Sequence, residues 1–215
     1  MKEIRFDRAL LRLYAIIDPR YTNASPLDVA RAVARCGATL LQVRGEGLSD
    51  FALYTLTCQL LEISKEFNVP LIVNDRADIA RAAGAAGVHV GHIGLEDLPP
   101  DAVRRVVGPD AIVGVSVASV EEALVAESLG ASYLSVGPIY TTASKDDAGA
   151  AVGLERIRLI RVRFSGPLCA IGGITPATAA EVIRAGADGV AVISALTTAA
   201  DPEMVARDFL RKLNA

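Results

Sequence analysis

Short apolar runs alternate along the chain with longer segments in which Ala, Leu, Glu and Arg dominate. This alternation from one end to the other is typical of βα units around a parallel sheet. The runs that we interpret as strands are Arg12–Asp18, Thr39–Arg44, Pro70–Asp75, Gly87–Gly91, Ala111–Val117, Tyr133–Gly137, Leu168–Gly173 and Gly189–Ser194. Their apolar residues are nearly continuous, as strands covered on both faces require. Eight parallel strands in 215 residues predict an α/β fold, a single (β/α)8 TIM barrel over residues 1–215, with an open doubly wound sheet as the alternative.

The residues expected at helix ends support this strand count. A capping oxygen followed by proline, whose missing N–H is harmless at a first helical position, begins at Ser25, Thr175 and Asp201. Ser119 and Glu122 have the spacing of a capping box. The glycines expected just past helix ends are Gly37, Gly84, Gly130 and Gly186.

Composition narrows the class of protein. Hydrophobic residues make up 52% of the chain and charged residues 22%, a balance typical of a packed globular protein. The formal net charge is -3 and the basic residues are scattered, so we expect no nucleic acid partner. Charged residues interrupt the apolar stretches within about ten residues, which predicts no membrane span. Residues 1–13 lack the apolar segment of a secretory signal, so we expect a cytoplasmic protein, and a homo-oligomer is left open.

Two connections are longer than the others, at residues 91–100 and 138–153. Both follow the carboxyl end of a predicted strand, which is the catalytic face of such barrels. Loops of this length at that face are often functional. The second connection carries several hydroxyl and small residues, and we predict that it is an active-site flap.

Polar residues at the end of the second predicted strand suggest anion binding. Gln42 and Arg44 are two residues apart, so they share one face of the strand and can both point to the barrel mouth. A guanidinium group there suits a two-pronged contact with phosphate. The alternative is a structural ion pair between Arg44 and Glu46, or a solvated loop arginine.

The third predicted strand ends in Asn74 and Asp75. A carboxylate at this place suits Mg2+, which proteins hold with one or two carboxylates plus substrate phosphate oxygens. Glu96 and Asp97 in the following long loop are candidates to complete that site. The alternative is that Asn74 and Asp75 only cap the next helix. His89 lies within the fourth predicted strand, and we interpret it as a core histidine with satisfied hydrogen bonds and not as a catalyst.

Two glycines, Gly172 and Gly173, end the seventh predicted strand just before a helix. Glycine lets backbone N–H groups approach an anion closely, and the loops after strands seven and eight form the recurrent phosphate site of this fold. The eighth strand ends at Ser194. Lys145 in the predicted flap lies close in sequence to hydroxyl residues and can close over a second anion. The alternatives are a tight turn at the glycines and a solvated loop lysine.

In this order, these residues resemble the thiamine-phosphate synthase family, which is related to the thiazole tautomerases, over nearly the whole chain. The motifs are Leu13-Tyr14-x-Ile16-x-Asp18, Gln42-x-Arg44, Asn74-Asp75-Arg76, Gly87-Val88-His89-Val90-Gly91, Gly114-Val115-Ser116, Gly137-Pro138-Ile139-Tyr140-x-Thr142-x-Ser144-Lys145, Ala170-Ile171-Gly172-Gly173-Ile174 and Ala191-Val192-Ile193-Ser194. The resemblance implies a Mg2+-dependent transferase of small phosphorylated thiamine precursors. Such an enzyme joins hydroxymethylpyrimidine diphosphate to hydroxyethylthiazole phosphate by a dissociative route and releases diphosphate.

The resemblance also implies roles for individual residues. Arg44, Lys145 and Ser116 are the catalytic candidates. The pyrimidine diphosphate would contact Gln42, Arg44, Asn74 and Lys145, with Ser116 near its reacting carbon. The thiazole phosphate would contact Thr142, Ser144, Gly173, Ile193 and Ser194. Asp75 would bind Mg2+, with Asp97 as the second acid.

Three features depart from the family pattern. Glu46 stands where the family usually has lysine, three extra residues precede Glu96, and Ser144 replaces a threonine. Ala118 occupies the position of the histidine base of the tautomerase, which favours the synthase over that relative. A thiazole tautomerase-like protein, a noncatalytic binder of thiazole phosphate or thiamine phosphate, and an unrelated phosphosugar isomerase are the alternatives.

Overall fold

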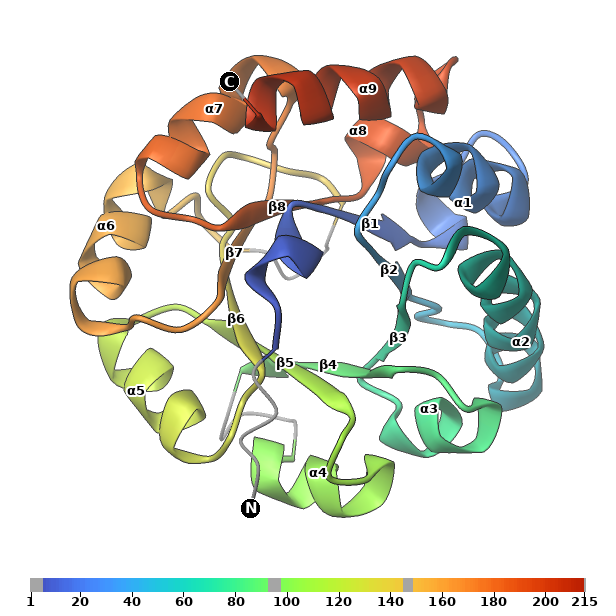
Figure 1. The fold of residues 1–215 in the computed structure, drawn as a ribbon, viewed down its shortest axis with the longest axis horizontal. Coiled ribbons are helices and arrows are strands. Elements are labelled where there is room, and N and C mark those ends of the chain that lie inside the picture. The colour runs from blue at the N-terminus through green and yellow to red at the C-terminus, as the bar shows by residue number, and fades with distance from the viewer. Residues whose placement is uncertain (1–5, 93–97, 145–148, 215) are drawn as a thin grey trace.

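The computed structural model describes residues 6–92, 98–144 and 149–214. Eight parallel strands pair in sequence order and close into a barrel (Figure 1). The strands are β1 (Leu13–Ile17), β2 (Leu40–Val43), β3 (Leu71–Asn74), β4 (Gly87–His92), β5 (Ile112–Val117), β6 (Tyr133–Val136), β7 (Leu168–Ile171) and β8 (Gly189–Val192). The pairing of β1 with β8 closes the sheet. The predicted TIM barrel is therefore confirmed, and the open doubly wound sheet is wrong.

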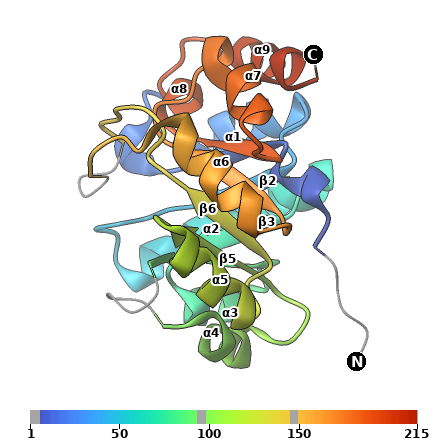
Figure 2. The same cartoon turned by 90° about the vertical axis from the view of Figure 1, so that its left-hand side faces the viewer.

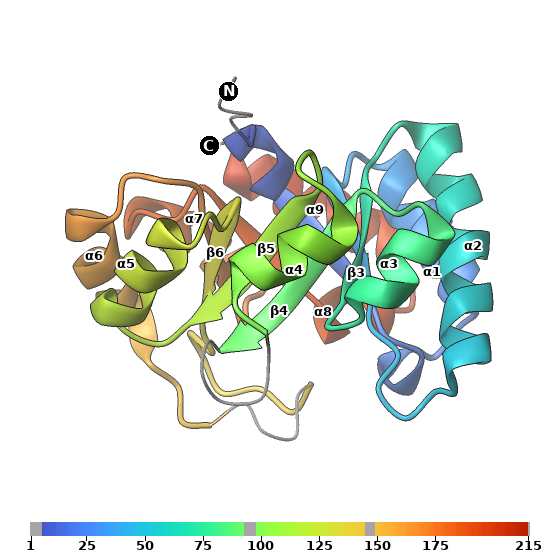
Figure 3. The same cartoon turned by 90° about the horizontal axis from the view of Figure 1, so that it is seen from below.

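Helices surround the barrel on the outside, as Figure 1 shows. They are α1 (Pro26–Arg35), α2 (Asp50–Phe67), α3 (Ala77–Ala83), α4 (Pro100–Val107), α5 (Val120–Ser128), α6 (Gly153–Arg163), α7 (Pro176–Arg184), α8 (Ser194–Thr197) and α9 (Pro202–Leu213), with short 3-10 helices η1 (Arg8–Leu11) and η2 (Pro19–Tyr21). Figure 2 shows α5 and α6 side by side against β5 and β6. Figure 3 shows η1, in dark blue, at one end of the barrel and α8 at the other. No helix in the described part of the chain is long and apolar enough to cross a membrane.

Alternation within each strand separates two apolar layers. One side chain set packs between the strands and the helices. The other lies inside the barrel and includes Tyr14, Leu40, Ile72 and Tyr133. Successive side chains point to opposite faces of a strand, so the residue two positions after each of these inward residues also points into the barrel, nearer to the carboxyl end of the strand. Polar residues at those next inward positions therefore face the barrel mouth.

The predicted helix ends agree with the structure in most details. Thr175 forms a capping box with Thr178, and Asp201 accepts from the Met204 N–H at 2.9 Å. Ser119 accepts from the Glu122 N–H at 3.1 Å, and the Glu122 carboxylate accepts from the Ala118 N–H at 2.8 Å. Ser25 precedes α1 without a side-chain cap. The four predicted glycines all have positive φ, between 75° at Gly84 and 116° at Gly186.

Candidate active site

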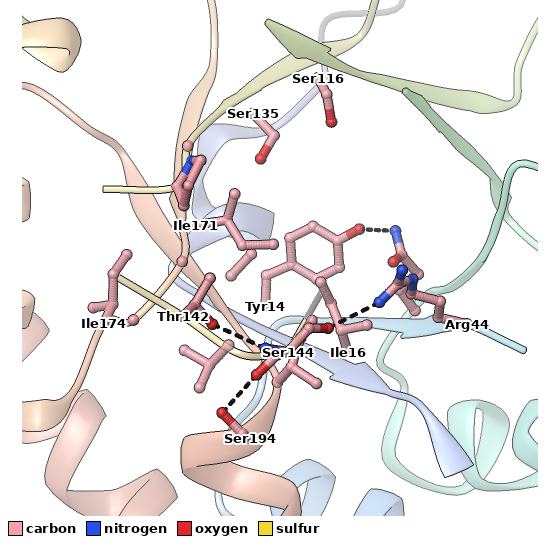
Figure 4. A pocket seen from close by; sticks show the side chains of 18 of the residues that line it. Tyr14, Ile16, Arg44, Ser116, Ser135, Thr142, Ser144, Ile171, Ile174 and Ser194 are labelled. Carbon is pink, nitrogen blue, oxygen red and sulfur yellow. Dashed lines mark hydrogen bonds between the residues drawn. The ribbon is translucent and has the colours of Figure 1, made fainter. Parts of the chain in front are cut away.

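A cavity of about 700 Å³ opens at the carboxyl ends of the strands, and side chains from all eight strands line it. Figure 4 shows a set of these side chains pointing toward a shared space. Of the residues predicted from the sequence, the cavity lining includes Gln42, Arg44, Asn74, Asp75, Ser116, Thr142, Ser144, Gly173, Ile193 and Ser194. The predictions for Glu96, Asp97 and Lys145 lie outside the described residues. A volume of this size is typical of small-molecule sites.

On the β1–β2 side, Arg44 is buried among acceptors. It lies 3.4 Å from the Asp18 carboxylate and 2.6 Å from the Glu46 carboxylate. The terminal nitrogen that lies near Asp18 also donates to the backbone carbonyl of Ser144 at 3.0 Å. The ion pair with Glu46, which the sequence left as an alternative, is therefore present. Arg44 still lines the cavity, so the ion pair and the predicted place at the barrel mouth occur together.

Arg20 completes this network from η2. Its guanidinium lies 3.2 Å from Asp18 and 2.6 Å from Glu46. The hydrogen bond to the fully buried Asp18 is the main cause that raises the pKa of Arg20 above its usual value. Two arginines and two carboxylates therefore balance one another at this side of the mouth. Glu46 is the member of the network that solvent reaches most, with 56% of its side chain exposed.

At the end of β3, Asp75 adopts a left-handed backbone conformation with φ of 59°. This conformation costs an L-residue other than glycine roughly 1–2 kcal/mol. Asp75 N–H donates to the His89 carbonyl at 2.7 Å, and the Asn74 side chain donates to the Asp75 carboxylate at 2.5 Å. Helix α3 has Arg76 at its N-cap, so neither Asn74 nor Asp75 is the N-cap residue of that helix. Strain held at a barrel mouth is typical of functional positions.

The donor set at this corner fits Mg2+ only with help from a ligand. Among the described residues, no three His, Cys, Asp or Glu side chains come together as a metal cluster. Asp75 is exposed at the mouth, and the amide of Asn74 is adjacent. Since Mg2+ needs few protein carboxylates when phosphate oxygens complete its shell, Asp75 fits that role beside a bound diphosphate.

The β6–β8 side is built from small residues and hydroxyl groups. Ser144 donates its hydroxyl proton to Ser194, the first residue of α8, at 2.8 Å, as Figure 4 shows. The Ser144 N–H donates to the Thr142 hydroxyl at 3.2 Å. Gly173 has φ of 63°, and a Cβ there would lie 2.6 Å from the Thr141 carbonyl oxygen. Glycine is therefore required because the loop after β6 packs directly on the end of β7.

Ser144 connects the two sides of the cavity. Its carbonyl accepts from Arg44 and its hydroxyl bonds to Ser194, so one buried residue spans the barrel mouth (Figure 4). The base of the same loop is held by the Tyr140 hydroxyl, which donates to Glu181 at 2.5 Å. Burial is the main cause that raises the pKa of Tyr140 to about 12. The described part of the predicted flap thus lies over the cavity.

Several cavity residues were not predicted from the sequence. Tyr14 and Ser135 line the cavity, Asp18 pairs with Arg44, and Arg20 pairs with Asp18. His89 was expected to be a satisfied core histidine, and it is buried with hydrogen bonds to Tyr133 and Ser116. A usable signal existed for Ser135, because it stands two residues after an inward aromatic residue of β6.

Comparison with known proteins places the chain in a family. Residues 13–196 match the family model described as thiamine monophosphate synthase. The chain is 47% identical to the thiamine-phosphate synthase of Roseiflexus castenholzii over 196 residues, which cover 91% of this chain and 85% of that protein. It is 44% identical to the thiamine-phosphate synthase of Moorella thermoacetica over 196 residues, which cover 91% and 92%.

A solved structure agrees with the family model and with these relatives. The thiamine phosphate pyrophosphorylase from Pyrococcus furiosus superposes with a TM-score of 0.86 at 35% identity, covering 96% of this chain and 97% of that one. The similarity thus extends over the strands, the loops at the barrel mouth and most of the helices. The chain belongs to the thiamine monophosphate synthase family.

Proposed function

We propose that the protein is a thiamine-phosphate synthase. It joins hydroxymethylpyrimidine diphosphate to hydroxyethylthiazole phosphate and releases thiamine phosphate and diphosphate. The observation that carries the proposal is a single cavity with two polar sides, one around Arg44 and one around Ser194, connected by Ser144. Two anionic substrates that must react with each other need such an arrangement. The named relatives and the family model support the same reaction.

The diphosphate of the pyrimidine half belongs on the β2–β3 side. Arg44 presents a buried guanidinium, and Gln42 and Asn74 add amide donors. Asp75 is the described residue that would hold Mg2+, with Asp97 as second acid, and Lys145 as a further cation over the substrate. Mg2+ would supply neutralisation of the charge on the diphosphate oxygens.

The phosphate of the thiazole half belongs on the β7–β8 side. Gly173 and Ile193 line the cavity, where their backbone N–H groups would bind the phosphate, and Ser194 is the first residue of the short helix α8. The hydroxyl groups of Thr142 and Ser144 face the same region. Loops after strands seven and eight form the recurrent phosphate site of this fold.

The reaction needs charge stabilisation and no strong base. The bond between the pyrimidine methylene carbon and the diphosphate oxygen breaks, and its electron pair leaves with diphosphate. The thiazole nitrogen then donates its lone pair to the methylene cation, which forms the new C–N bond. Arg44, Asn74 and Lys145 would stabilise the leaving group, because fixed donors aimed at developing charge are often the largest catalytic contribution. Ser116 would orient the pyrimidine ring.

A coupling assay tests the proposal. Purified protein is mixed with both substrates and Mg2+, and phosphorus NMR follows the appearance of diphosphate and thiamine phosphate. Product is expected from the wild type, and removal of the donor in Arg44→Ala is expected to lower kcat by about a hundredfold or more. Asp75→Ala is expected to abolish product formation, because the Mg2+ ligand is lost. A wild type that binds both substrates and forms no product with any divalent metal would overturn the proposal.

One observation favours a second candidate, a noncatalytic binder of thiazole phosphate. The Arg44 guanidinium is already paired with Asp18 and Glu46, so an incoming diphosphate must compete with a carboxylate. Calorimetry separates the two functions. Binding of thiazole phosphate without binding of pyrimidine diphosphate would select the binder, and binding of both selects the synthase.

A further inference from the structure

A chain of hydrogen bonds joins polar side chains across the inside of the barrel. The Gln42 amide donates to the Tyr14 hydroxyl, and the Tyr133 hydroxyl donates to the same Tyr14 oxygen at 3.1 Å. The Tyr133 oxygen lies 2.8 Å from His89 Nδ1, and His89 Nε2 lies 3.1 Å from Ser116 Oγ. Five side chains from five different strands thus form one chain from Gln42 to Ser116, and all of them except Tyr133 line the cavity.

We propose that His89, fixed by Tyr133, makes Ser116 a hydrogen-bond acceptor for an N–H group of the pyrimidine substrate. His89, Tyr133 and Tyr14 are then positioning residues that act through Ser116. This inference rests on the proposed function, because it assigns the aminopyrimidine half of the reaction to the Ser116 side of the cavity. It does not follow from the two anion subsites, which lie around Arg44 and Ser194.

Packing holds the chain in one geometry. The rings of His89 and Tyr133 stack at 5.5 Å, and Tyr14 meets Tyr133 edge to face at 6.0 Å. A Cβ on Gly114 would lie 2.4 Å from the Tyr133 oxygen and 2.5 Å from His89 Nδ1, so glycine keeps open the space in which these two atoms meet. The interior of a barrel of this class is commonly filled with Val, Ile and Leu. Three polar rings in that place must satisfy one another, since an unpaired buried polar group costs about 1–3 kcal/mol.

The donor at the contact between Tyr133 and Tyr14 sets the direction that we propose for the chain. Burial raises the pKa of both Tyr14 and Tyr133 well above the usual value, so each phenol keeps its one proton at neutral pH. Tyr133 donates that proton to Tyr14, so it accepts at its contact with His89 Nδ1. A neutral imidazole with Nδ1–H has an accepting Nε2. Ser116 therefore donates its proton to His89 Nε2 and turns oxygen lone pairs to the cavity.

The direction of the chain has a consequence for recognition. A serine oxygen whose proton is already used accepts hydrogen bonds and offers no donor. The pyrimidine half of the reaction carries an exocyclic amino group, which is a donor, whereas the thiazole half has no N–H group. Ser116 therefore selects the pyrimidine by hydrogen-bond polarity as well as by position. If His89 carried its proton on Nε2, the Ser116 hydroxyl would instead turn its proton to the cavity and oppose the donor of the amino group.

The tautomer can be measured without any substrate. The chain has two histidines, His89 and His92, so NMR spectra of the imidazole nitrogens in nitrogen-labelled protein contain two ring systems, assigned with His92→Gln. The result expected for His89 is a protonated Nδ1 and an unprotonated Nε2. A protonated Nε2 would overturn the proposal, whatever the enzyme does. In Tyr133→Phe, which keeps the ring packing, the population is expected to shift toward Nε2–H.

Kinetics then tests the role in recognition. Tyr133→Phe is expected to raise KM for the pyrimidine diphosphate about three- to tenfold, the worth of one hydrogen bond, with KM for the thiazole phosphate unchanged. In a Ser116→Ala background the same substitution is expected to have no further effect, because the two act as a unit. Equal effects in both backgrounds, or equal changes in both KM values, would contradict a positioning role. Tyr54→Phe, a tyrosine on α2 outside the cavity lining, is the matched control and is expected to leave both KM values unchanged.

If the wild type makes no thiamine phosphate, the proposed function fails and the tautomer measurement still decides whether Ser116 is an acceptor. If the wild type is active and His89 carries its proton on Nε2, the proposed function stands and only the present inference fails.

Discussion

Replacing Glu46 with glutamine is expected to tighten the binding of diphosphate. The Glu46 carboxylate lies 2.6 Å from the guanidinium groups of both Arg44 and Arg20, so it occupies donors that the proposed diphosphate site would use. Arg44 keeps its contact with Asp18 at 3.4 Å and with the Ser144 carbonyl at 3.0 Å in this variant, so the guanidinium stays in place. The substitution removes one competing charge and leaves the geometry.

The expected change in the binding free energy of diphosphate follows from the distance between Glu46 and Arg44 and from the exposure of Glu46. Two unit charges at about 4 Å and an effective dielectric near 20 interact by about 4 kcal/mol. More than half of the Glu46 side chain, 56%, is exposed, so solvent screens most of that energy. Exposed ion pairs are worth at most about 1 kcal/mol, which corresponds to about a fivefold decrease in Kd.

Calorimetric titration of inorganic diphosphate with Mg2+ into wild type and Glu46→Gln measures this difference. Asp50→Asn is the matched control, because it removes the same charge from a carboxylate that lies 2.6 Å from Arg76 outside the cavity lining. The gain is expected to shrink as ionic strength rises, since salt screens exposed charges. An unchanged or larger Kd in Glu46→Gln would refute the reasoning, and would show that Glu46 holds Arg44 in its binding position.

Three further changes have defined outcomes. Asp75→Asn is expected to raise the Mg2+ concentration for half-maximal activity at least tenfold, because asparagine lacks the charge of the carboxylate. The Tm is expected to stay unchanged, because asparagine tolerates the φ of 59°. A Mg2+ titration of activity and a parallel thermal melt measure the two quantities. Gly173→Ala is expected to lower the free energy of unfolding by about 1–3 kcal/mol, because its Cβ would meet the Thr141 carbonyl at 2.6 Å, and urea unfolding measures this; a loss below a few tenths of a kcal/mol would mean that the loop moves aside. The pKa of Tyr140 is raised from 10.0 to about 12 in the folded protein, so its contribution to stability is complete below pH 10.0 and is lost as pH rises toward 12. In Tyr140→Phe, the loss of stability over this pH range, measured by urea unfolding, is expected to be smaller than in the wild type. An identical loss in both proteins would contradict this assignment.

The fold was predictable from the sequence because each strand carries its own local signal. Seven of the eight predicted runs contain the observed strand, and β4 extends one residue past its predicted run, since a strand buried on both faces reads as a continuous apolar run. The ends were less accurate. The seventh predicted strand was extended to Gly173, whereas β7 ends at Ile171 because Gly172 has φ of 98° and turns the backbone away. Such a turn depends on the loop packed against it, so the local sequence pattern does not predict it.

The site was predictable where spacing alone places a residue. Gln42 and Asn74 stand two residues beyond an inward apolar residue of their strands, so alternation sends them to the mouth. The ion pair of Glu46 with Arg20 was not predictable, since the direction of a loop side chain depends on what meets it in space. The contact between Tyr14 and Tyr133 joins residues 119 apart in sequence, and no local pattern encodes it.

A crystal structure of the protein with thiamine phosphate, diphosphate and Mg2+ tests the central claim most directly, because it locates both anions in one cavity. The account predicts the ester phosphate at hydrogen-bonding distance from the backbone of Gly173 and Ser194, and the diphosphate on Arg44 and Asn74 with Mg2+ on Asp75. Both anions on the same side of Ser144, or diphosphate bound away from Arg44, would contradict it.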